Sequence, residues 1–151
     1  MLKRVQVKKG GVEMKCKLFV TLIVVFVMGT LSSSRASTQI DWDTVPERTR
    51  EALAKAQQEM NENDHQRAID ILKRVEKREK YNHFLIEFNM GTAYALTCQI
   101  DKAIYHLEKS SEMEPDYSPT WMNLGKLHYQ QENFLQAGMA LEKGFRSAPT
   151  K

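Results

Sequence analysis

Histidine is the residue type in this sequence that could most directly bind a metal or transfer a proton, and it occurs four times. His65, His83, His106 and His128 form no His-x3-His pair, and no paired cysteines accompany them as zinc ligands. The sequence also lacks a glycine-rich phosphate loop and a Gly-x-Ser-x-Gly nucleophile motif. We therefore expect no metal site, no cofactor and no catalytic residues, and the protein is predicted not to be an enzyme.

Two clusters of charged residues have structural interpretations. Glu112, Glu114 and Asp116 are typical of a solvated turn at the end of a helix. The run at residues 73–80 alternates between basic and acidic side chains, which indicates an exposed helical face. A docking strip for an acidic partner is the alternative interpretation of this run.

The net charge of +3 is distributed unevenly along the chain. Of the 22 basic and 19 acidic residues, seven basic residues and one acidic residue lie in 1–36, which leaves 15 basic and 18 acidic residues in 37–151. The larger part of the chain is therefore acidic overall, and its charge does not favour binding to nucleic acid.

The sequence contains an internal repeat, because residues 84–117 match residues 118–151 at a spacing of 34. The matched landmarks are Glu87 and Trp121, Met90 and Leu124, Gly91 and Gly125, Tyr94 and His128, Ala103 and Ala137, Leu107 and Leu141, and Pro115 and Pro149. Trp121, Leu124 and Gly125 recur at i, i+3 and i+4, which is one stripe of an α-helix.

A looser third copy lies upstream. Ala68 stands 35 residues before Ala103, which indicates that one residue has been inserted between the first and second copies. In the first copy, Ala52 and Ala56 stand where the tryptophan and glycine landmarks are expected.

This period and these landmarks resemble the tetratricopeptide-repeat (TPR) family over residues 49–151, and the chain is similar to a small, exported, bacterial-type member. The resemblance implies an all-α fold, an antiparallel helix-pair solenoid of about three repeats, preceded by a signal peptide or an N-terminal anchor. The repeats are expected at about 49–83, 84–117 and 118–151, and the helices at 46–62, 64–79, 83–97, 100–113, 118–131 and 134–147. The landmark residues should face the packing between helices, with Gly91 and Gly125 where two helices approach closely.

In TPR proteins the first helix of each repeat lines an inner groove that binds an extended peptide or a partner helix. Carried over by register, the groove residues are Leu85, Phe88, Asn89, Thr92, Met122, Asn123, Lys126 and Tyr129. Asn89 and Asn123 are equivalent and could bond the backbone of a peptide, and the alternative interpretation is that asparagine belongs to the repeat consensus at this position. The inward basic residues of the chaperone-binding subclass are missing, so an apolar or amphipathic ligand is expected.

The N-terminal residues 1–36 resemble an extension followed by a signal peptide. Lys15 and Lys17 precede an uncharged apolar stretch at 18–31, and small residues at Ser34 and Ala36 suit cleavage after Ala36. An uncleaved anchor at 16–34 is the alternative. Residues 37–48 form a short lead-in segment.

Our second hypothesis is that translation starts at Met14 instead of Met1. The codons of the Lys-Lys-Gly-Gly segment before Met14 can contain a bacterial ribosome-binding sequence, and Met14 would then begin a compact signal peptide.

Two roles follow for a non-catalytic protein with these features. The first is an exported, periplasmic or secreted adaptor that binds a protein or peptide in its groove, or the same domain held outside the cytoplasm by an inner-membrane anchor. The second is a dedicated subunit of a cell-envelope complex. Phe134, Met139, Leu141 and Phe145 on the last helix cannot all face inward, so this helix could also dock a partner or a second copy. The membrane is expected to be contacted only through the N-terminal segment.

Overall fold

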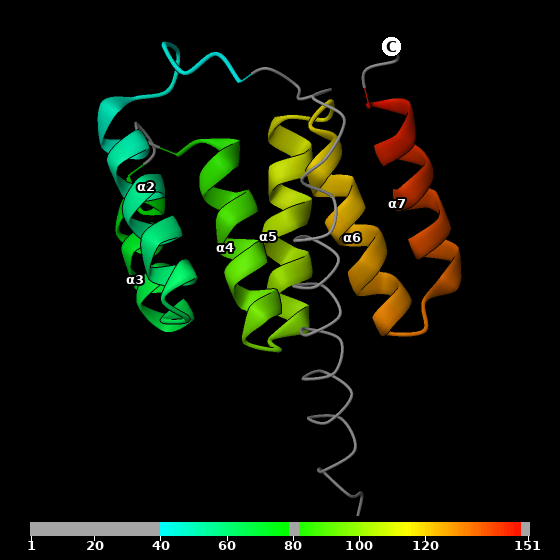
Figure 1. Ribbon diagram of the computed structural model, residues 1–151. Helices are drawn as coiled ribbons and strands as arrows, with labels where there is room; N and C mark the ends of the chain where they lie inside the picture. Colours follow the sequence, from blue (N-terminus) through cyan, green and yellow to red (C-terminus); the bar gives the residue numbers. More distant parts are fainter. Residues whose placement is uncertain (1–39, 79–81, 149–151) are drawn as a thin grey trace, which may run out of the picture. The chain divides into compact units, whose positions relative to one another are not determined.

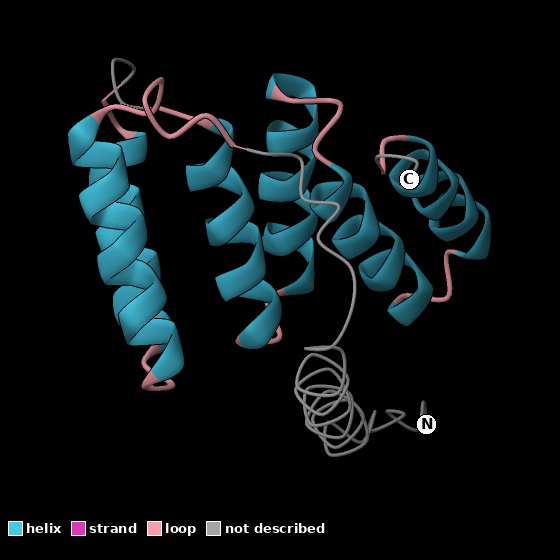
Figure 2. Ribbon diagram, turned by 45° about the horizontal axis from the view of Figure 1, so that its top comes forward, coloured by secondary structure: helices cyan, strands magenta, loops and turns pink. Residues whose placement is uncertain are grey.

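The computed structural model describes residues 40–78 and 82–148, and these fold into six α-helices in consecutive antiparallel pairs (Figure 1). The helices are α2 (Glu47–Asn61), α3 (His65–Glu76), α4 (Phe84–Leu96), α5 (Ile100–Met113), α6 (Ser118–Gln130) and α7 (Phe134–Arg146). Neither described range contains a strand (Figure 2). The all-α helix-pair fold is thus confirmed, and the largest difference from the expected ranges is the end of α3 at Glu76 instead of 79.

Several sequence predictions fall outside the described ranges. They concern the signal peptide in 1–36, the start at Met14, the anchor at 16–34 and the landmark Pro149. Within the described ranges, no helix combines the length and apolar character needed to cross a bilayer.

The turn inside each helix pair has the same backbone conformation in all three repeats. Asn63, Cys98 and Glu132 have φ values of 63°, 58° and 64°, and they are separated by 35 and then 34 residues. This left-handed residue lets the next amide close the helix end, as in the 2.9 Å bond from the amide of Asn133 to the carbonyl of His128. The structure therefore reproduces the repeat period, including the inserted residue, in its turns.

The two landmark glycines lie where the helices of a pair approach closely. A Cβ atom at Gly91 would stand 2.6 Å from Cγ of Leu107 and 3.0 Å from the carbonyl oxygen of Ala103. At Gly125 the nearest atom would be Cγ of Leu141, again at 2.6 Å. The equivalent contact in two repeats explains why glycine is tolerated inside a helix despite its cost of about 1 kcal/mol relative to alanine.

The core runs through all three repeats and includes residues of the lead-in segment. Ile69, Leu72 and Ile86 have no exposed surface, and Val45, which precedes α2, is 2% exposed. Ile40 also packs against this core, so the lead-in predicted at 37–48 contributes to the fold from residue 40. These contacts position α2 at the start of the stack.

Candidate protein-interaction site

The first helices of the three repeats form one continuous face. α4 contacts α2 on one side and α6 on the other, whereas the second helices pack mainly on the helices adjacent to them in sequence. We call the surface formed by α2, α4 and α6 the first-helix face.

Two of the predicted groove residues, Thr92 and Asn123, meet between α4 and α6. The side-chain amide of Asn123 points its nitrogen at Oγ1 of Thr92 at 3.5 Å, and Thr92 donates to the backbone carbonyl of Phe88 at 2.9 Å. The side-chain nitrogen of Asn89 donates to the carbonyl of Leu85 in its own helix at 2.8 Å. All three polar side chains are half-buried, so they lie at the surface without being fully solvated.

Three apolar residues predicted for the groove lie elsewhere or are partly covered. Leu85 is 3% exposed and belongs to the core, so it offers no surface to a ligand. Phe88 packs edge-on against Tyr117, with ring centroids 5.2 Å apart. Met122 lies against α7, where its sulfur would be 3.0 Å from a Cβ atom at Gly144. Helical register places these residues on the correct helix, but it does not distinguish a side chain at the rim from one in the core.

The remaining two groove residues are exposed at the far end of the face. Lys126 is exposed, and Tyr129 is 58% exposed at the end of α6. The Tyr129 ring packs edge-on against Phe134 of α7, with centroids 5.6 Å apart. Aromatic side chains that remain exposed are typical anchors of protein interfaces.

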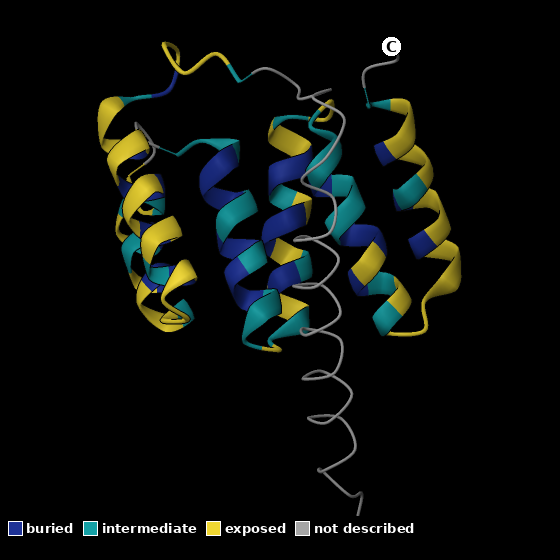
Figure 3. Cartoon of the chain, viewed as in Figure 1, coloured by how far each residue is buried: buried dark blue, intermediate teal, exposed yellow. Residues whose placement is uncertain are grey.

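Much of α7 is exposed (Figure 3), and several of its exposed residues are apolar. The exposed apolar residues are Phe134, Leu135, Met139 and Phe145, whereas Leu141 is half-buried against α6. The sequence predicted exposure of part of this helix but did not identify Leu135, which is the most exposed of the four.

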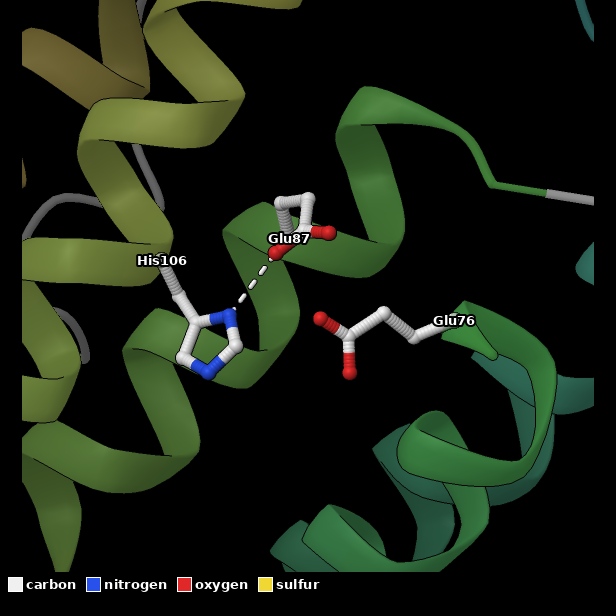
Figure 4. A group of neighbouring side chains, drawn as sticks. All are labelled: Glu76, Glu87 and His106. Atoms are coloured by element: carbon white, nitrogen blue, oxygen red, sulfur yellow. Dashed lines mark hydrogen bonds and ion pairs between the residues drawn. The ribbon is translucent and has the colours of Figure 1, made fainter. Parts of the chain in front are cut away.

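A charged network that the sequence did not predict lies between the first and second repeats (Figure 4). Glu87 occupies the position of Trp121 in the last repeat and is fully buried. Its carboxylate accepts a hydrogen bond from Nδ1 of His106 at 2.7 Å and another from Nζ of Lys109 at 2.7 Å. Lys109 also bonds Glu76 of α3 at 3.1 Å, so the network joins two repeats.

The pKa values of this network follow from its geometry. Burial raises the pKa of Glu87, but the hydrogen bonds and charges of His106 and Lys109 outweigh burial and hold that pKa below its ordinary value of 4.5. Burial lowers the pKa of Lys109, and its bonds to the two glutamates outweigh this effect and raise the pKa above 10.5. Glu87 is therefore an anion at neutral pH, and His106 must donate through Nδ1.

Three of these side chains are of types that can bind a metal ion. Ligand atoms of Glu76, Glu87 and His106 lie within 4.8 Å of one another. However, the ammonium group of Lys109 lies at hydrogen-bond distance from both carboxylates. A lysine cation therefore already pairs with the two glutamates, as in an ion-pair network.

Comparison with known proteins supports the same fold. No family model matches the chain. It is similar to the TPR repeat-containing protein PA0015 of Pseudomonas aeruginosa, with 32% identity over 66 residues. That match covers 44% of this chain and 63% of the relative's length. The crystal structure of the Sgt2 TPR domain from Aspergillus fumigatus is also similar, with a TM-score of 0.63 and 20% identity over 77% of this chain and 72% of that one.

Proposed function

We propose that this chain belongs to the tetratricopeptide-repeat family, because it is similar in sequence to a TPR repeat-containing protein and in fold to a TPR domain. Such arrays present extended surfaces to other proteins, so the chain is proposed to be a non-catalytic protein-interaction module. Its ligand is a peptide or helix of a partner protein that lies along the first-helix face. The observation that carries this proposal is the pair Asn89 and Asn123, which occupy equivalent positions on α4 and α6.

The hydrogen bonds of these two asparagines leave part of each amide available. In each case the hydrogen bond uses the side-chain nitrogen, and within the described residues no donor reaches the amide oxygen. An amide oxygen can accept a hydrogen bond from the backbone N–H of a ligand without regard to its side chains. Tyr129 at the end of the same face supplies an aromatic surface for an apolar ligand residue.

We also propose that the protein acts outside the cytoplasm, as a periplasmic or secreted adaptor. The support is the sequence of residues 1–36, in which basic residues precede a short apolar stretch and small residues follow it.

The function is tested by affinity capture from the membrane and periplasmic fractions, followed by binding measurements with the captured partner. The double variant Asn89→Ala/Asn123→Ala should fold as the wild type does and bind about threefold to tenfold more weakly for each bond lost. The matched control is Gln66→Ala/Gln136→Ala, because both glutamines are exposed on second helices. Equal binding by the test and control variants would show that the first-helix face is not used in this way.

A dedicated subunit of a cell-envelope complex is the second candidate, and the exposed apolar side of α7 favours it. Phe145 is 70% exposed and Leu135 is 73% exposed, so a partner could bury both. Leu135→Glu/Phe145→Glu should then release one stoichiometric partner without lowering the melting temperature. Retention of that partner by the variant would count against this role.

A further inference from the structure

A groove between α2 and α3 lies on the outer side of the first repeat. Its volume is about 810 Å³, and it is lined by Arg48, Glu51, Ala52, Ala54, Lys55, Gln58, Ile71, Arg74, Val75 and Arg78. The groove exists because Ala52 occupies the register position that holds Glu87 in the second repeat and Trp121 in the third. A methyl group therefore stands where the other repeats have a large side chain.

The rim of the groove is strongly basic. Four of its lining residues are basic and one, Glu51, is acidic. Lys55, Arg74 and Arg78 are exposed, and no salt bridge found in the described ranges joins any of them to a carboxylate. The apolar floor comes from Ile71, Val75 and the two alanines.

The second repeat shows which side chain pairs with the equivalent basic residue inside this molecule. Lys109 is the register equivalent of Arg74, and it binds the carboxylate of Glu76, which projects from the preceding helix α3. α3 itself packs on α4 with a buried apolar side. In the second repeat, the basic residue at this register position thus pairs with a carboxylate from an amphipathic helix.

We propose that the groove between α2 and α3 binds an acidic amphipathic helix of another protein. Its apolar side covers Ala52, Ile71 and Val75, and a carboxylate pairs with Arg74. Two other candidate occupants of the groove match its basic charge less well. Residues 1–36 of this chain are themselves basic, and α7 of a second copy presents Lys143 and Arg146 against a single acidic residue, Glu142.

The proposal is tested with two synthetic peptides of the length of α3 and the purified full-length protein. Both peptides carry the same apolar residues at i, i+3, i+4 and i+7, and they differ only in having glutamate or lysine at the flanking positions. The glutamate peptide should bind, with an affinity that falls as salt is added, and the lysine peptide should not.

Two variants locate the binding. Arg74→Glu should weaken binding of the glutamate peptide about tenfold, whereas Lys77→Glu, an equal charge change at an exposed residue outside the groove lining, should not. Ala52→Trp should fill the groove and abolish binding. It should also retain the melting temperature, because Trp121 sits at the same register position with Nζ of Lys143 4.3 Å from its ring centroid.

Three results would overturn the proposal. The first is absence of binding by the glutamate peptide, and the second is equal binding of both peptides or of the Arg74 and Lys77 variants. The third is a dimer that is detected by sedimentation and that dissociates in the Ala52→Trp variant. The groove would then be occupied by a second copy of this chain. The Asn89→Ala/Asn123→Ala variant should bind the glutamate peptide normally, which separates this surface from the first-helix face.

Discussion

Nδ1 of His106 lies 2.7 Å from the buried carboxylate of Glu87. Glu87 stands at the register position that Trp121 occupies in the last repeat. The second repeat therefore fills its landmark position with a charged side chain and its partners. A buried carboxylate is tolerated there because His106 and Lys109 both donate to it.

Glu87→Gln should destabilise the protein at neutral pH by about 1.5–3 kcal/mol, the range for a hydrogen bond to a charged group. Because the pKa of Glu87 is depressed in the folded state, its contribution is present above the unfolded pKa and is lost as pH falls. The difference from wild type should therefore shrink below about pH 4.5. Chemical denaturation at a series of pH values measures this difference in unfolding free energy, and Glu108→Gln at an exposed position is the control. A difference that does not depend on pH would contradict this account.

Gly91→Ala should destabilise the protein although alanine favours helices. The added Cβ would lie 2.6 Å from Leu107 and 3.0 Å from a backbone oxygen, and such overpacking typically costs about 1–3 kcal/mol. Gly138 on α7 is the matched control, because a Cβ there meets no atom within 4 Å. Gly138→Ala should gain up to about 1 kcal/mol. The melting temperatures of the two variants should thus shift in opposite directions from that of the wild type.

Glu132→Gly should stabilise the turn between α6 and α7. Glu132 has φ of 64°, a left-handed conformation that disfavours residues with a Cβ by about 1–2 kcal/mol. Asn63 has nearly the same φ, but asparagine adopts this region more readily, so Asn63→Gly should gain less. If differential scanning calorimetry shows equal shifts for the two variants, backbone strain at Glu132 is not the cause.

The mature protein is predicted to begin at Ser37, after cleavage behind Ala36, because small residues follow a short apolar stretch in the leader. N-terminal sequencing of the protein from the periplasm or medium measures this directly. Recovery of the uncut chain from membranes alone would favour the anchor at 16–34. Peptides from residues 1–13 in whole-cell proteomics would exclude translation from Met14.

The sequence by itself determined the helices, their pairing and the repeat. Helical stripes and turn residues act over a few positions, so the 34-residue spacing of Gly91 and Gly125 was enough to identify the fold and its close helix approach. The same register placed Asn89 and Asn123 on one face. These features depend on local geometry that recurs in each repeat.

Only the tertiary structure decided which side chains meet across repeats. Glu76 and Lys109 are 33 residues apart in sequence, and their bond depends on how α3 packs on the next helix pair. Register likewise placed Ala52 at a landmark position but did not show that its small side chain leaves an open basic groove. Leu85 was assigned to the right helix, yet its burial was set by the neighbouring helices. Distances between helices, which no local pattern encodes, control all three.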